Sequence, residues 1–175
     1  TQIAEYWNGE VRWMNSGELN LKNVYEVDGR ITIEGLKNSA TKLIPENCIL
    51  IGLAGQGRTR GTVAINHITL CTNQSIAAIF PNSKYVSKYL YYNLDMRYEE
   101  LRELSSGDSG RGGLNLKIIG DLVVNWPPID EQASISQILT DMDSEISTLE
   151  TKLEKAKKIK QGMMQDLLTG KVRLI

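Results

Sequence analysis

The sequence predicts an α+β fold: a domain of mixed strands and short helices, followed by one long C-terminal helix. Apolar runs separated by turn residues indicate several short strands in the first 128 residues. Pro127 and Pro128 then end the apolar segment, because proline lacks an amide donor. From Asp130 to Leu168 there is no proline and a single glycine, which indicates one helix roughly 58 Å long. We therefore divide the chain into a globular domain (1–128), a helix (129–170) and a C-terminal tail (171–175).

Turn residues separate the expected elements of the globular domain. A helix is expected over Ser83–Leu104, with Ser83 as its cap, because tyrosine and aliphatic residues recur there near helical spacing. Ser16–Glu18 is expected to form a turn, and Leu114–Val124 to return to apolar structure. The expected strands are Val11–Met14, Ile31–Ile33, Ile44–Leu53, Thr62–Ile65 and Ser75–Phe80.

The composition is that of a soluble globular protein, with 41% hydrophobic and 23% charged residues. No apolar run approaches the ~18 residues that cross a bilayer, and no secretion leader begins the chain, so we expect a cytoplasmic protein without a membrane partner. Cys48 and Cys71 lack the spacing of metal ligands and are expected to be buried free thiols. No metal site is therefore expected.

Charge is distributed unevenly although the net charge is only −1. No acidic residue lies between Glu46 and Asp95, a stretch that carries two arginines and two lysines. Such a segment can present a positive face in a nearly neutral protein. Chance clustering on a solvated loop is the alternative.

The long helix carries an apolar stripe with the 3–4 spacing of a coiled coil. Acidic residues crowd its first part and lysines its second, so an antiparallel pair would set opposite charges against each other. We expect an antiparallel coiled coil with a second helix; docking of the stripe on the chain's own globular domain is the alternative. The stripe consists of Ile135, Leu139, Met142, Ile146, Leu149, Leu153, Ala156, Met163 and Leu167, with a gap at Lys160.

A glycine-rich loop, 54–61, holds the first candidate DNA contacts: Gln56, Arg58, Thr59 and Arg60. It lacks the Lys-Ser/Thr ending of a phosphate-binding Walker loop and does not fit a dinucleotide fingerprint. Small residues let the backbone approach phosphate, and arginine can bind guanine edges or phosphates in a bidentate manner. A plain tight turn with exposed arginines explains the spacing equally well.

Two further segments add polar candidates. Asn73 and Gln74 suit adenine edges, although they could instead hold the loop to the neighbouring strand. The second glycine-rich segment, 105–113, offers Ser109 and Arg111 as DNA contacts, or is a solvated linker. His67 is the only histidine and has no evident acid–base partner, and no Gly-x-Ser-x-Gly elbow is present, so no catalytic residue is expected.

Several segments resemble the specificity subunits of type I restriction–modification systems. Glu5–Gly9 through Asn15–Leu19 is similar to the opening of a target-recognition domain of that family, and Gly52–Gly61 with Thr72–Gln74 to its middle. Pro127-Pro128-Ile129-Asp130-Glu131-Gln132 resembles the start of the family's spacer helix. Met164-Gln165-Asp166-Leu167-Leu168-Thr169-Gly170-Lys171-Val172-Arg173 resembles its end, with Met163 in place of the usual leucine.

The resemblance implies a non-catalytic subunit that recognises part of a bipartite double-stranded DNA target. It further implies docking to methyltransferase subunits and, through them, to restriction/translocase subunits. S-adenosylmethionine, ATP and Mg are then used by those partners, and this chain binds no cofactor directly. One recognition domain and one helix correspond to half of such a subunit or to a fragment, so pairing with a second copy or a second half-subunit is expected. A coiled-coil adaptor that binds only proteins is the alternative.

Overall fold

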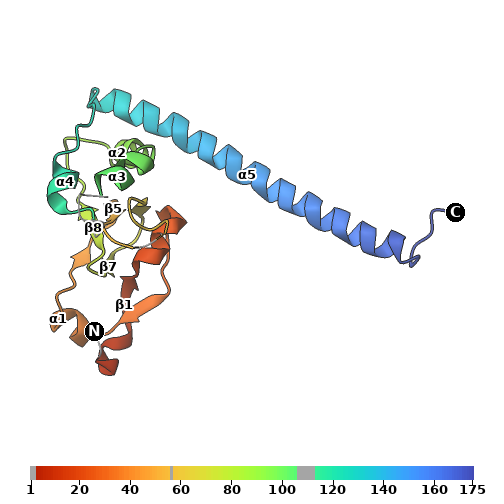
Figure 1. Cartoon of the computed structure of the whole chain (residues 1–175), viewed down its shortest axis with the longest axis horizontal. Coiled ribbons are helices and arrows are strands. Elements are labelled where there is room, and N and C mark those ends of the chain that lie inside the picture. The colour runs from red at the N-terminus through yellow and green to blue at the C-terminus, as the bar shows by residue number, and fades with distance from the viewer. Residues whose placement is uncertain (1–2, 56, 106–112) are drawn as a thin grey trace. The chain divides into compact units, whose positions relative to one another are not determined.

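The computed structural model describes residues 3–55, 57–105 and 113–175, which form two compact units, Thr1–Ala133 and Ser134–Ile175. The first unit is built on two four-stranded sheets (Figure 1). One sheet has the order β3-β1-β7-β4, with strands β1 (Trp7–Met14), β3 (Gly29–Ile31), β4 (Leu43–Ile44) and β7 (Leu70–Thr72). The other has the order β2-β6-β5-β8, with β2 (Asn23–Val24), β5 (Ile49–Gly52), β6 (Val63–Asn66) and β8 (Ile76–Ile79).

Pairing in both sheets is mostly antiparallel. β5 lies between antiparallel neighbours, with Leu50 opposite both Ala64 and Ala78. Parallel pairs join β1 to β7 and β2 to β6, so each sheet is mixed. The helical segments are η1 (Ala4–Tyr6), η2 (Ser16–Leu21), α1 (Ile33–Lys37), α2 (Ser87–Asp95), α3 (Tyr98–Leu104), α4 (Leu116–Gly120) and α5 (Ile129–Leu168).

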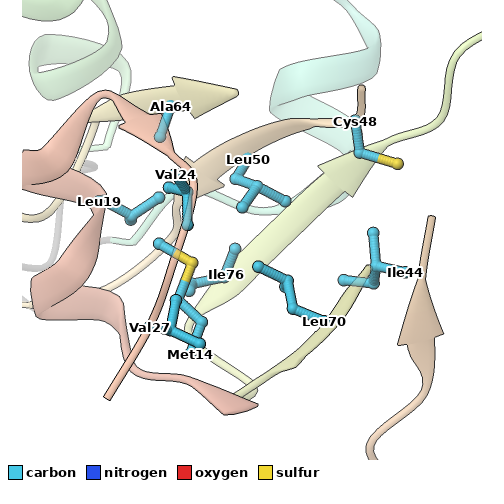
Figure 2. Packing of buried hydrophobic residues seen from close by; sticks show 10 residues of the cluster. All are labelled: Met14, Leu19, Val24, Val27, Ile44, Cys48, Leu50, Ala64, Leu70 and Ile76. Carbon is cyan, nitrogen blue, oxygen red and sulfur yellow. The ribbon is translucent and has the colours of Figure 1, made fainter. Parts of the chain in front are cut away.

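Two apolar clusters bury opposite faces of the central strands β5 and β6. Leu50 and Ala64 point into the first cluster, which also holds Met14 and Leu70 (Figure 2). Ile49, Ile51, Val63 and Ile65 point into the second, together with residues of α2 and α3. Burial on both faces explains why these strands are continuously apolar rather than alternating. Figure 1 shows α2 and α3 beside β5.

The α+β class and the long helix are confirmed; the helix begins at Ile129, where the expected helical segment begins, and ends at Leu168. Among the described residues, no helix is both long and apolar enough to span a membrane. Expected strands at Val11–Met14, Thr62–Ile65 and Ser75–Phe80 correspond to β1, β6 and β8. The expected turn at Ser16–Glu18 begins the 3-10 helix η2, which the Asn15 side chain caps at Gly17 N.

The helix expected at Ser83–Leu104 is wrong in its extent. It begins at Ser87 and is divided at Met96 and Arg97, where the backbone of Arg97 leaves the helical region. The guanidinium of Arg97 there binds Glu100 and the backbone carbonyl of Val123. Because Val86 occupies the cap position, Ser83 does not cap the helix.

Two strand predictions are also wrong. The strand expected at Ile44–Leu53 is divided by a turn at which Asn47 has a φ of 64°. The strand expected at Ile31–Ile33 ends at Ile31, because the Thr32 hydroxyl accepts a hydrogen bond from Gly35 N at 3.0 Å and begins α1. In the apolar segment 114–124, the short helix α4 is capped by Asn115.

Candidate nucleic-acid interface

The glycine-rich loop joins β5 to β6 and is closed by hydrogen bonds across its base. Gly61 N donates to Gly52 O at 2.9 Å, and Gly52 N donates to Thr62 O at 3.0 Å. A Cβ on Gly52 would lie 2.1 Å from Thr59 O, so only glycine permits this close approach of the two loop ends. Glycine at position 52 therefore allows the two ends of the loop to lie this close together.

Two side chains of helix α3 bind backbone oxygens in the outer part of this loop. The Tyr98 hydroxyl donates to Arg58 O at 3.3 Å, and the Arg102 guanidinium donates to Gly57 O. Arg102 also donates to the Tyr98 hydroxyl at 3.1 Å and lies over its ring. These two side chains were not among the predicted site residues, because their contacts join positions that are 40 and 45 residues apart in the chain.

The two arginines of the loop have different surroundings. Arg58 is exposed, and its backbone rather than its side chain is held by Tyr98. Arg60 is half-buried, and its Nη1 donates to the hydroxyl and the carbonyl of Ser105 at 3.3 and 3.5 Å. This arrangement makes Arg58 the better candidate for a DNA contact and gives Arg60 a part in fixing the end of α3. Thr59 is half-buried between them.

Asn73 and Gln74 lie in the turn between β7 and β8. Asn73 Oδ1 accepts a hydrogen bond from Ser75 N at 3.1 Å, a contact that shapes the turn. Ser75 O in turn accepts from Leu53 N at 2.8 Å, which joins this turn to the start of the glycine-rich loop. Gln74 is exposed. Gln56, Ser109 and Arg111, the other predicted contacts, lie outside the described residues.

In α5 the stripe is largely exposed within the single chain. Met142, Ile146, Leu149 and Leu153 are each 52–55% exposed, far more than core residues of their type. Ile135, Leu139 and Leu167 are half-buried, while Ala156 and Met163 are exposed. Near its end the apolar surface widens beyond the predicted residues, and a hollow there is lined by Ala156, Ile159, Lys160, Met163, Met164, Leu167 and Leu168. Ile159 thus fills the gap that Lys160 leaves in the stripe.

Two large pKa shifts are those of Glu26 and Cys48. The Arg12 guanidinium beside Glu26 lowers the pKa of that carboxyl to about 2. Burial raises the pKa of Cys48 to about 11, and both cysteines are buried free thiols. Across residues 3–55, 57–105 and 113–175, no cluster of three or more histidine, cysteine, aspartate or glutamate residues could hold a metal ion.

Comparison with known proteins identifies the family of this chain. The model for the type I restriction modification DNA specificity domain matches residues 1–160. The chain belongs to this family. As a specificity domain it is 30% identical over 164 residues to the MjaIX specificity subunit of Methanocaldococcus jannaschii, covering 91% of this chain and 37% of that protein. It is 26% identical over 143 residues to the EcoR124I/EcoR124II specificity subunit of Escherichia coli, covering 80% and 35%.

Solved structures share the fold of this specificity domain. A chain from a study of complex assembly in the type I R-M system matches with a TM-score of 0.69 and 16% identity, over 95% of this chain and 41% of that one. The HsdS subunit from Thermoanaerobacter tengcongensis matches with a TM-score of 0.65 and 15% identity, over 95% and 40%. The chain thus spans about two fifths of the length of the proteins it matches.

One residue of the helix-start motif of this specificity domain has a role that sequence reasoning missed. Gln132 is 1% exposed and belongs to the first compact unit. Its Nε2 donates to Pro127 O at 2.8 Å, and its Oε1 accepts from Val86 N at 2.9 Å. The side chain therefore fastens the first turn of α5 to the start of α2. The Pro-Pro-Ile-Asp-Glu-Gln motif marks the start of the helix in the sequence, but it does not reveal the contact with Val86.

Proposed function

We propose that this chain is a non-catalytic DNA-specificity module that recognises one part of a bipartite target for a type I restriction–modification complex. The family match supports the class of function. The observation that carries the proposal within the chain is the exposed side chain of Arg58, on a loop whose backbone α3 holds in place. A fixed backbone with an outward arginine suits recognition of a guanine edge or a phosphate.

The proposal includes the assembly in which the module would act. Methyltransferase subunits dock on it, and restriction/translocase subunits join through them. S-adenosylmethionine, ATP and Mg serve those partners, while this chain binds none of them directly. The complex acts on DNA in the cytoplasm.

The test begins with the methylation pattern made by the reconstituted complex, since sequencing the methylated adenines reveals the target. Arg58→Ala is then expected to lower binding of duplex DNA that carries this target. A phosphate contact would reduce the slope of log affinity against log salt by about one, whereas a base contact would relax selectivity at one position, costing about 1–3 kcal/mol. Arg12→Ala is the matched control, because Glu26 already neutralises that guanidinium at 3.1 Å.

The competing adaptor function makes the opposite prediction. If the chain were a protein-only adaptor, the Arg58→Ala variant would bind its protein partners with the same affinity as the wild type. Neither chain would distinguish one DNA duplex from another. Target binding that survives Arg58→Ala unchanged in affinity, salt slope and selectivity would refute the assignment of this loop to DNA.

We also propose that α5 pairs antiparallel with a second copy of itself or with a second half-subunit. The exposed stripe supports pairing, since each of its large side chains would gain about 1.5–3 kcal/mol on full burial. Charge supports the direction: in an antiparallel pair centred near Glu150, Asp143 would lie opposite Lys157 and Glu145 opposite Lys155. A parallel pair would place like charges together.

Cysteine crosslinking tests the direction. Chains carrying Ile135→Cys are expected to form disulfides with chains carrying Leu167→Cys, and neither variant is expected to crosslink with itself. The native cysteines do not interfere, because both are buried. Disulfides between two copies of Ile135→Cys would exclude the antiparallel arrangement.

A further inference from the structure

A hollow of the globular domain lies on the sheet that contains β1. Its volume is about 410 Å³, within the ~300–1,000 Å³ range of small-ligand sites. Tyr6, Trp7 and Trp13 supply aromatic walls, and the rings of the two tryptophans lie 4.9 Å apart at 86°. Lys42 and Gln74 line the same hollow and are exposed.

The walls of this hollow are fixed by backbone contacts. Thr32 N donates to Tyr6 O at 2.9 Å, and a Cβ on Gly35 would lie 2.8 Å from the same oxygen, so η1 packs directly on α1. On the other side, the Thr41 hydroxyl donates to Thr72 O at 2.9 Å and ties the segment before β4 to β7. The hollow therefore exists before any ligand arrives.

The lining matches the chemistry of a nucleobase. Aromatic side chains stack on the faces of bases, and this stacking tolerates any sequence. An amide such as that of Gln74 can donate to and accept from a base edge, and a lysine at the rim suits the attached phosphate. A hollow lined only with aliphatic groups would offer none of these contacts.

The hollow also adjoins the proposed DNA-contacting loop. Asn73 and Gln74 line it, and the next residue, Ser75, accepts a hydrogen bond from Leu53 N at 2.8 Å, where the glycine-rich loop begins. We propose that this hollow binds a single unstacked nucleobase of the DNA strand that the glycine-rich loop contacts. The inference rests on the proposed function for the identity of the strand, whereas the hollow itself can be tested with free nucleotides.

Tryptophan fluorescence provides the test, because the chain has only three tryptophans. In the full-length chain carrying Trp126→Phe, the remaining indoles are the two that line the hollow. The four deoxynucleoside monophosphates are titrated in turn, with free tryptophan as the control for absorbance and collisional quenching. Saturable quenching is expected with nucleotides and not with deoxyribose 5-phosphate, which lacks the base.

Two exposed positions then locate the binding. Lys42→Ala and Gln74→Ala in the Trp126→Phe chain are each expected to weaken nucleotide binding at least about fivefold, which for Gln74 is the lower end of what a base contact contributes. Lys117→Ala, which removes an exposed lysine from α4 that does not line the hollow, is expected to change nothing. No saturable quenching by any of the four nucleotides, or quenching that both variants leave unchanged, overturns the proposal.

The same variants separate this proposal from the proposed function. Arg58→Ala is expected to lower duplex binding while nucleotide quenching stays as in the parent chain. Duplex recognition without nucleotide quenching would overturn the nucleobase site alone. Nucleotide quenching in a chain that shows no duplex selectivity within its reconstituted complex would support the nucleobase site and refute the proposed function.

Discussion

Gln132→Ala is expected to weaken the contact between the first turn of α5 and the start of α2. The substitution removes the donor to Pro127 O and the acceptor for Val86 N, both at normal hydrogen-bond distances in a site where Gln132 is 1% exposed. Two such bonds contribute about 1–3 kcal/mol together, and the lost buried methylene adds about 0.8 kcal/mol. The free energy of unfolding should therefore fall by about 2–4 kcal/mol.

Chemical denaturation of the full chain measures this change directly, and thermal denaturation should show a lower Tm. At about 2–4 °C per kcal/mol for a chain of this size, the Tm should fall by roughly 4–16 °C. Gln137→Ala is the matched control on the same helix, since its amide is exposed and donates to Asp141 one turn away, at 2.8 Å. Such a surface pair contributes about 0.2–0.5 kcal/mol. If Gln132→Ala and Gln137→Ala proved equally stable, the proposed anchoring role of Gln132 would be wrong.

Three other perturbations have definite expected outcomes. Leu149→Lys places a charge near the centre of the proposed helix pair in both copies and should raise the dimer dissociation constant at least about 100-fold, measured as mass by light scattering. The lowered pKa of Glu26 means that its ion pairs stabilise the fold above its ordinary value of 4.5 and lose this effect as the pH falls toward 2. The stability difference between wild type and Glu26→Gln should therefore shrink over that window in pH-dependent denaturation, and a constant difference would contradict the assignment. Cys48 should resist alkylation in the folded chain, because burial raises its pKa to about 11, and should react once denaturant is added; rapid native labelling in mass spectrometry would argue against that burial.

The long helix could be predicted from sequence because its signal is local and repeated. The 3–4 apolar spacing recurs from Ile135 to Leu167, and no proline interrupts the segment from Ile129 to Leu168. The failures lie where tertiary contacts override local pattern. Leu70–Thr72 is only three residues long and becomes strand β7 by pairing with β1 and β4, which no local period reveals. Arg97 divides an otherwise helical run while it binds the carbonyl of Val123, which lies 26 residues away in the chain.

In the candidate interface, too, local features could be predicted from the sequence and tertiary contacts could not. Glycine-rich composition located the loop, and the arginines in it were evident, but the different environments of Arg58 and Arg60 depend on Ser105, 45 residues beyond Arg60. Tyr98 and Arg102 were overlooked for the same reason, since they act on the loop through space. The aromatic hollow joins Trp7 and Trp13 to Gln74, which are far apart in the chain, so no sequence motif announces it.

The support of the glycine-rich loop by α3 has a consequence for how such modules diversify. Tyr98 and Arg102 bind backbone oxygens of the loop, so these contacts do not depend on which side chain the loop carries at position 58. Substitution at Arg58 can then alter what is recognised while the path of the chain is retained. In a library randomised at this position and selected for binding to different duplexes, variants with new sequence preferences should keep the same loop backbone.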